Sequence, residues 1–120
     1  MATCIDLSGS SYPTERSGVK VTPYEGVSLA PALAGSPLHR PQPIFWEHEG
    51  NRAIRDGRWK LVSKHNHRWE LYNMDSDRTE TEDLYTTHAD RAQAMAKTWE
   101  DWATRVGVKP WPIATKNQTR

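Results

Sequence analysis

The sequence lacks several features that would assign it quickly to a familiar class. It has one cysteine, Cys4, in 120 residues, so an internal disulfide is excluded. It has no run of 18 apolar residues, the length that a membrane-spanning helix requires, and no basic segment followed by an apolar leader. The residues therefore indicate neither a membrane span nor an export signal.

A strong overall charge is also missing, because the formal net charge is +1, but the charges are unevenly placed. Residues 52–70 hold six basic and two acidic side chains, whereas residues 75–90 hold six acidic and one basic. No nucleic-acid-binding motif accompanies the basic stretch, so no nucleic-acid partner is expected. Alternating charges on the wet face of a sheet are the commoner cause of such a stretch.

Aromatic residues are plentiful, with six Trp and four Tyr, although the apolar fraction is only 36%. A disordered chain rarely carries so many, and these side chains can anchor a compact core. A domain of this size buries roughly two-thirds of its unfolded surface. We therefore expect one small folded domain.

The first 42 residues predict little regular structure. "MATCIDL" is typical of the last turns of an apolar helix without a capping residue, so we expect that the natural beginning of the chain is missing and that Cys4 is buried. Residues 8–26 are rich in Ser, Gly, Pro and Thr and predict an ordered loop. Residues 27–35, with Pro31 inside and Gly35 at the end, predict one or two helical turns, and a proline-rich connector follows.

Residues 43–73 predict a small antiparallel sheet of about four strands. The four runs are rich in aromatic and β-branched residues and read "PIFWEHE", "NRAIRD", "RWKLVSK" and "RWELYN". Asp56-Gly57 predicts a two-residue type I′ turn between the second and third runs. Apolar and polar residues alternate in the last two runs, so one face of the sheet can be buried.

An amphipathic helix is predicted over residues 88–106, where apolar residues recur at three- and four-residue spacing. Thr87 and Asp90 resemble a capping box at its start, and Gly107 can end it. A sheet and a helix with one apolar face each bury those faces together, which predicts an α+β fold. We expect the helix to contribute Trp99 and Trp102 and the sheet to contribute Trp59, Leu61, Trp69 and Leu71.

The stretch "FWEHEGNR" invites a catalytic interpretation. We expect Glu47 and Glu49 on one side of a strand and His48 on the other, so the three do not converge without neighbouring strands. Paired carboxylates can act as acid and base, but a strand-borne Glu beside an Arg is more often a cross-strand ion pair. His65 and His67 lack the further ligands of a metal site. The residues thus predict neither a catalytic centre nor a metal site.

The order of several motifs is more informative than any one of them. "TPYEGVSLAPALAG" resembles a sulfatase-family segment that follows the last part of the catalytic domain, and "MATCIDLSGSSYP" resembles the helix before it. "RPQPIFWEHEGNRAIRDGRWKLV" is similar to the opening strands of the C-terminal subdomain of arylsulfatase-like members, and "WELYNMDSDRTETEDL" resembles its next strand and the loop that leads to the final helix. The resemblance covers residues 1–107 and is to the C-terminal portion of a formylglycine-dependent sulfuric ester hydrolase.

The resemblance implies that residues 1–42 are the end of the catalytic domain and a connector, and that residues 43–107 are the C-terminal subdomain. Residues 108–120 lack periodicity and are expected to form a tail that wraps over the surface or frays. In this family a Cys or Ser in a Cys/Ser-x-Pro-x-Arg motif becomes formylglycine and acts beside calcium. Cys4 lacks the proline and arginine of that motif. The nucleophile and the calcium ligands are therefore expected in a missing catalytic domain, the partner of this chain, and the fragment alone is expected to be inactive toward sulfate esters.

The four candidates for contact with the substrate rim or with the catalytic domain lie in the "HEGNR" stretch; they are His48, Glu49, Asn51 and Arg52. The alternative function is a free-standing module that binds a sulfated or otherwise anionic partner through Arg52, Arg55, Arg58, Lys60 and Lys64. Members of the family are commonly periplasmic or secreted, but the sequence itself does not specify a location, a particular sulfate ester or an oligomeric state.

Overall fold

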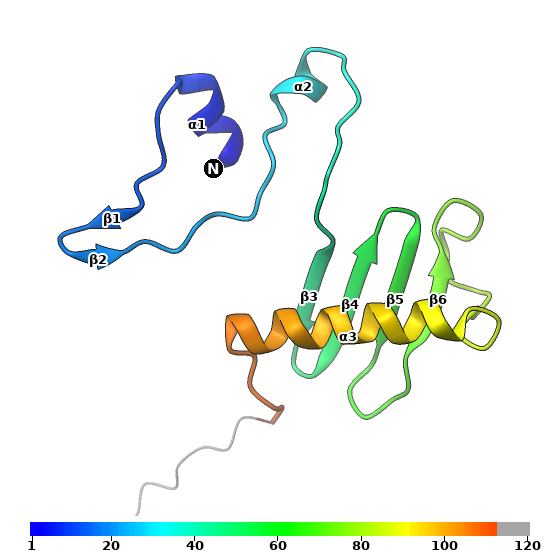
Figure 1. The fold of residues 1–120 in the computed structure, drawn as a ribbon. Coiled ribbons are helices and arrows are strands. Elements are labelled where there is room, and N and C mark those ends of the chain that lie inside the picture. Colours follow the sequence, from blue (N-terminus) through cyan, green and yellow to red (C-terminus); the bar gives the residue numbers. More distant parts are fainter. Residues whose placement is uncertain (113–120) are drawn as a thin grey trace, which may run out of the picture. The chain divides into compact units, whose positions relative to one another are not determined.

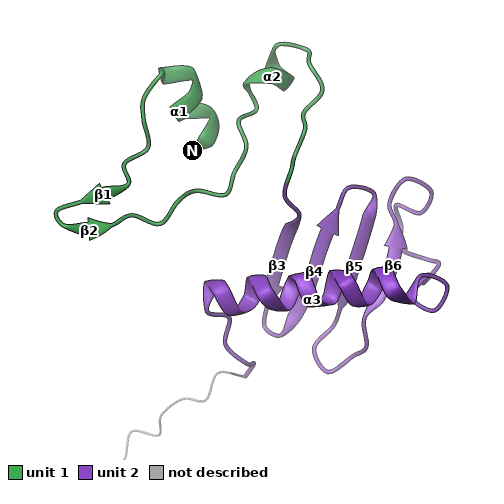
Figure 2. Cartoon of the chain, viewed as in Figure 1, with its two compact units in different colours: residues 1–41 green, residues 42–120 purple. Residues whose placement is uncertain are grey.

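The computed structural model describes residues 1–112 and divides the chain into two compact units. The first unit is Met1–Pro41 and the second begins at Gln42 (Figure 2). The first unit contains helix α1 (Ala2–Ser8), strands β1 (Glu15–Arg16) and β2 (Val19–Lys20), and helix α2 (Ala30–Leu33).

The two short helices of the first unit agree with the sequence prediction. Helix α1 ends at Gly9, which has the left-handed φ of 65° that a helix terminator adopts. Helix α2 is a single turn with Pro31 in its first turn, where a missing N–H costs nothing. The predicted burial of Cys4 is wrong, because its side chain is exposed on a helix whose buried residue is Ala2.

A hairpin interrupts the loop predicted over residues 8–26. Strands β1 and β2 pair with Glu15 opposite Lys20, and the turn between them has φ of 51° at Ser17 and 77° at Gly18. Two consecutive positive φ angles are the mark of a type I′ turn. The hairpin was missed because neither two-residue strand shows an apolar alternation.

The second unit is a four-stranded antiparallel sheet covered on one face by a long helix, which confirms the predicted α+β class. The strands are β3 (Ile44–His48), β4 (Asn51–Asp56), β5 (Trp59–Ser63) and β6 (Glu70–Asn73), in that order across the sheet. Helix α3 (Ala89–Val106) crosses all four strands (Figure 1). Within the described residues, no helix combines the length and the apolar character needed to traverse a lipid bilayer.

The two tight turns of the sheet differ from the prediction. Asp56 pairs with Trp59, so the β4–β5 turn is centred on Gly57-Arg58, one residue later than predicted, and only Gly57 has a positive φ. That pattern fits a type II′ turn rather than the predicted type I′. The type I′ pattern instead occurs at Glu49-Gly50 between β3 and β4, with φ of 53° and 80°.

The hydrophobic core lies between the sheet and α3, as predicted. Leu61 and Leu71 are fully buried, Ile54 is 1% exposed and Trp99 is 5% exposed. Trp59 is also buried in this cluster, and Trp69 and Trp102 pack against it. Phe45 stacks on Trp102 with ring centroids 5.0 Å apart, which extends the core to the edge strand β3.

The two ends of α3 are stabilised differently. The N-cap residue is His88, without a side-chain cap, and Thr87 Oγ1 donates to the Leu84 carbonyl instead, so the predicted capping box is wrong. Gly107 ends the helix in the left-handed conformation, as predicted. Beyond it, the Val108 N–H donates to the Ala103 carbonyl, whereas residues 113–120 of the predicted tail lie outside the described residues.

Asp83 completes the outer edge of β6. Its Oδ1 accepts hydrogen bonds from the Leu71 N–H at 3.0 Å and the Tyr85 N–H at 2.9 Å, and its Oδ2 lies 2.9 Å from Arg68 Nη1. Burial acts to raise the pKa of the Asp83 carboxyl, but the two N–H donors and the Arg68 charge outweigh it and hold the pKa below its usual range. The carboxylate therefore satisfies an edge N–H that would otherwise lack a partner.

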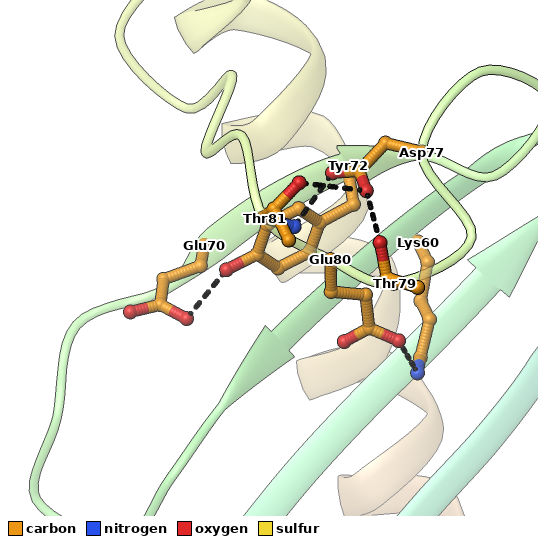
Figure 3. Close-up of polar contacts among 7 residues, drawn as sticks. All are labelled: Lys60, Glu70, Tyr72, Asp77, Thr79, Glu80 and Thr81. Atoms are coloured by element: carbon orange, nitrogen blue, oxygen red, sulfur yellow. Dashed lines mark hydrogen bonds and ion pairs between the residues drawn. The ribbon is translucent and has the colours of Figure 1, made fainter.

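On the sheet face opposite α3, the acidic loop after β6 lies beside Tyr72 and Lys60 (Figure 3). The Tyr72 hydroxyl donates to Glu70 Oε2 at 2.9 Å, and burial together with this carboxylate raises the pKa of Tyr72 to about 12. Lys60 pairs with Glu80 of the loop. The loop is ordered by Asp77, whose Oδ2 accepts the N–H groups of Thr81 and Glu82. The resemblance assigned this stretch to the loop before the final helix, and its acidic residues explain the uneven charge.

Replacement of Leu61 by Ala should lower the free energy of unfolding of the second unit by about 2–5 kcal/mol, because the site is fully buried and a cavity would remain. The same substitution at Leu33, which is 73% exposed, should change it by less than about 0.5 kcal/mol. Urea unfolding followed by tryptophan fluorescence measures both. Equal effects of the two substitutions would contradict the assigned core.

Acid should destabilise the protein partly through Asp83. Because its folded pKa is lowered, its stabilising contribution is present above the ordinary Asp pKa of about 3.9 and is lost as the pH falls through the lower folded value. Asp83→Asn, which keeps the Oδ1 acceptor, should flatten the dependence of unfolding free energy on pH between the ordinary Asp pKa and the lower folded value. An unchanged acid slope in the variant would show that Asp83 does not contribute.

Candidate functional site

The four residues predicted at a substrate or domain rim all lie on the β3–β4 hairpin, but their environments differ. His48 and Asn51 face each other at the ends of the strands, and Glu49 occupies the turn. These three side chains are exposed, whereas Arg52 is half-buried. Glu49 and Glu47 therefore do not share a strand face as predicted, because Glu49 has left the strand for the turn.

Local hydrogen bonds hold the hairpin tip in place. Glu47 Oε1 accepts from the Gly50 N–H at 2.9 Å, and Asn51 Nδ2 donates to the His48 carbonyl at 2.8 Å. Asn51 Oδ1 accepts from the His65 N–H at 3.2 Å, which links the tip to the β5–β6 connection. One carboxylate oxygen of Glu47 and both amide atoms of Asn51 thus have structural partners, and Asn51 is a positioning residue of the tip.

Arg52 has the most constrained environment of the four. Its guanidinium lies over the rings of Trp69 and Trp99, 4.4 Å and 5.5 Å from their centroids, a favourable cation–π geometry. Nη2 donates to Ser63 Oγ at 3.1 Å, and Ser63 is 3% exposed. Glu47 is its partner across the strands, yet no salt bridge joins Arg52 to a carboxylate of the described residues. The predicted cross-strand ion pair at this position is therefore absent from that part of the chain.

A cavity of about 450 Å³ lies beside Arg52, between the β3–β4 hairpin and the end of α3. Its remaining lining residues are Glu47, Gly50, His65, Asn66, Trp99, Glu100, Ala103, Thr104, Val108, Lys109, Pro110 and Trp111. Of the predicted rim residues, only Arg52 lines this cavity. Glu47 and Gly50 belong to the same stretch as the predicted rim residues, but sequence reasoning missed the rest of the lining because those residues come from distant segments and share no motif. The one sequence signal for this cavity was Trp111, a large aromatic residue in a polar tail. Its side chain is exposed in the structure.

The basic residues of the alternative binding module do not form one surface. Arg52 lies on the face covered by α3, whereas Arg55 and Lys60 line a hollow on the opposite face. Lys60 is paired with Glu80, and Arg55 Nε donates to the Gly57 carbonyl at 3.2 Å. Arg58 lies in the β4–β5 turn over the ring of Trp59. A single basic sheet face that contains all five cations is thus not formed.

Calcium and formylglycine, the cofactors that the sulfatase resemblance implies, do not fit the residues present. Within residues 1–112, no group of three or more His, Cys, Asp or Glu side chains could hold a metal ion. The sequence contains one Ser-x-Pro-x run, at Ser11–Thr14, but it is followed by Glu15 rather than arginine. Neither this run nor Cys4 therefore supplies the motif that formylglycine formation requires.

Comparisons with known proteins agree on one relationship. The chain is 31% identical over 83 residues to an uncharacterized sulfatase of Schizosaccharomyces pombe, covering 65% of this chain and 15% of that protein. The fold resembles that of Ps i-CgsB, solved in complex with k-i-k-neocarrahexaose (TM-score 0.63, 23% identity, 85% of this chain and 22% of that chain). It also resembles BT4656, solved with its substrate D-glucosamine-2-N,6-O-disulfate (TM-score 0.59, 20% identity, 88% and 23%). No protein-family model matches the chain.

These findings confirm the resemblance to the C-terminal portion of a sulfatase. The structural matches establish the fold, and the sequence match carries the sulfatase relationship. The chain spans about 15% of the length of the curated relative and less than a quarter of the solved chains. In extent it therefore corresponds to a part of those proteins.

The β3–β4 tip should be sensitive to any side chain at Gly50. A Cβ there would lie 2.3 Å from His65 Nδ1, and the φ of 80° is also unfavourable for other residues. Gly57→Ala is the matched control, because Gly57 has a φ of 53° but open space around it. We expect Gly57→Ala to cost about 1–2 kcal/mol of stability from backbone strain, and Gly50→Ala to cost about 1–3 kcal/mol more from crowding. Equal losses in urea unfolding would show that His65 moves aside freely.

Proposed function

We propose that this chain is the C-terminal portion of an arylsulfatase-type sulfuric ester hydrolase, whose whole protein hydrolyses sulfate esters. The observation that carries the proposal is the 31% identity to a sulfatase over 83 residues, from a segment that folds like parts of two much longer solved proteins. The sequence motifs support it, because they occur along residues 1–107 in the order expected for the rear of such an enzyme.

We further propose that this portion is inactive toward sulfate esters by itself. Cleavage of a sulfate ester needs a positioned nucleophile and fixed positive charge around the developing anion, and loss of such groups costs several orders of magnitude in rate. Cys4 and Ser11 lack the surrounding motif. The hydroxyl beside Arg52 is that of Ser63, which is 3% exposed and is engaged with the Lys64 and His67 carbonyls. The catalytic domain of the whole protein would supply the formylglycine and the calcium ion.

The partner of the second unit would then be that catalytic domain. The sheet face opposite α3 is suited to the contact, because Trp46 is 46% exposed there and lines a hollow with Ala53 and Val62. An exposed large aromatic beside smaller apolar side chains is typical of an interaction surface. In this arrangement α3 covers one face of the sheet and the catalytic domain covers the other.

The inactivity is tested with the purified chain and 4-nitrophenyl sulfate. We expect no release of nitrophenol above the buffer rate, whereas an intact sulfatase in the same assay should give rapid turnover. Nitrophenol release that co-elutes with the chain through size-exclusion and a second chromatographic step would overturn the proposal. Two separations are needed because a trace of contaminating sulfatase would otherwise imitate activity.

The relationship to a whole sulfatase is tested by reading the coding sequence upstream of Met1. A Cys/Ser-x-Pro-x-Arg coding stretch in the same frame, or in an adjacent frame joined by a single disruption, is the expected result. An unrelated upstream gene with its own stop signal would argue for a separate small protein.

A further inference from the structure

We propose that the cavity beside Arg52 binds an acidic sugar residue, with Arg52 contacting the anionic group and Trp111 contacting the ring. This inference rests on the proposed function and names the class of molecule that the C-terminal portion would recognise. It concerns binding by residues of this chain and requires no catalytic step. The argument has three parts: the state of Arg52, the exposed indole, and the mixed charge of the lining.

The guanidinium of Arg52 is pre-organised for binding an anion. The rings of Trp69 and Trp99 and the Ser63 hydroxyl fix the plane of the guanidinium, so little side-chain entropy remains to be lost on binding. A guanidinium carries five N–H donors, and one of them is engaged by Ser63. Since no carboxylate among the described residues forms a salt bridge with it, its charge is available to a sulfate or carboxylate.

Trp111 provides a flat apolar surface at the same cavity. Its side chain is 40% exposed although it is one of the largest in the chain, and it lines the cavity together with the buried Trp99. Indoles combine apolar area with one N–H donor, which suits a ligand that has apolar C–H faces and polar edges. The cavity volume of about 450 Å³ also lies in the range of small-molecule sites.

The mixed charge of the lining distinguishes a singly charged sugar from a polyanion. Glu47 and Glu100 lie in the same lining as Arg52 and Lys109, so a densely charged ligand would meet two repelling carboxylates. Hydroxyl groups can instead donate to these carboxylates and to the Asn66 amide. The lining therefore favours a hydroxyl-rich ring that carries one acidic group.

A second cavity of about 720 Å³, at the start of α3, lacks this combination. It contains Arg91, but that guanidinium lies 5.1 Å from the ring of Trp59, a buried core residue. The rest of its lining consists of short polar side chains, two alanines, Met95 and His88, without an indole. The proposal is therefore specific to the cavity beside Arg52.

The test is a titration of the ¹⁵N-labelled chain followed by the indole N–H signals of its tryptophans. The probes are the 6-sulfates of glucose and galactose, glucuronate and galacturonate, the neutral parent sugars, and sodium sulfate. We expect saturable shifts of the Trp99 and Trp111 signals with at least one acidic sugar, and affinity about tenfold lower for the matching neutral sugar. Comparison of the sulfated and carboxylated arms identifies the acidic group.

Two pairs of variants assign the binding to the cavity. Arg52→Lys keeps the charge but removes the planar fork, and Trp111→Ala removes the exposed ring; each should weaken binding about tenfold or more. The controls are Arg55→Lys and Trp46→Ala, which make the same changes on the opposite sheet face and should bind like the unmodified chain. The unaffected amide signals of each variant report whether it is folded, and Trp111→Ala tests the cavity without altering the core.

Three results would overturn the proposal: no saturable shift of the cavity indoles with any acidic sugar, equal affinity for the neutral sugar or for sodium sulfate, or weaker binding in a control variant but not in Trp111→Ala. The sugar-binding proposal and the proposed function can be contradicted independently of each other. Loss of sugar binding would leave the sulfatase relationship intact if the catalytic motif is encoded upstream. Absence of that motif would remove the sulfatase proposal without changing the titration.

Discussion

The second unit depends on the docking of one indole, Trp99, between the helix and the sheet. Its ring packs against Trp69 and Trp102, with centroids 5.9 Å away in both cases, and its Nε1 donates to the Trp46 carbonyl of the edge strand at 3.0 Å. A buried indole without a partner for its N–H would be costly, so this hydrogen bond and the apolar contacts favour the same position. Because the sheet has one apolar face and α3 has one apolar stripe, neither is stable in water without this contact.

The same indole connects the core to the candidate site. Trp99 lies beneath the Arg52 guanidinium and also lines the cavity, so the position of the cation follows from the packing of the helix. Ser63 of β5 and Trp69, which directly precedes β6, fix the position of the guanidinium. A site built in this way is rigid because its supporting residues belong to the core, and rigidity is what makes a single cation selective. The proposed binding of a ligand at this site is compatible with the proposed lack of catalysis by this chain alone.

The sequence predicted the features that depend on periodic apolar residues. The four strands and the helix were found because Trp59, Leu61 and Leu71 alternate in the sheet and Met95 and Trp99 repeat in the helix, and both patterns result directly from burial of one face. The β1–β2 hairpin and the exact turn centres were missed, because turn geometry depends on local φ angles that residues such as Ser17 and Glu49 adopt only in context. The cavity could not be predicted, since Arg52, Asn66 and Trp111 meet only after folding.

Hydrogen exchange of the Trp99 indole N–H tests the central claim most directly. If this group is donated to the Trp46 carbonyl inside the docked helix, it should exchange as slowly as the backbone amides of the central strand β5, because both require opening of the core. The indole N–H of Trp46, whose side chain is 46% exposed, gives the fast reference in the same spectrum. Exchange of Trp99 at the rate of Trp46 would contradict the account, because the helix would then not be held on the sheet by this contact.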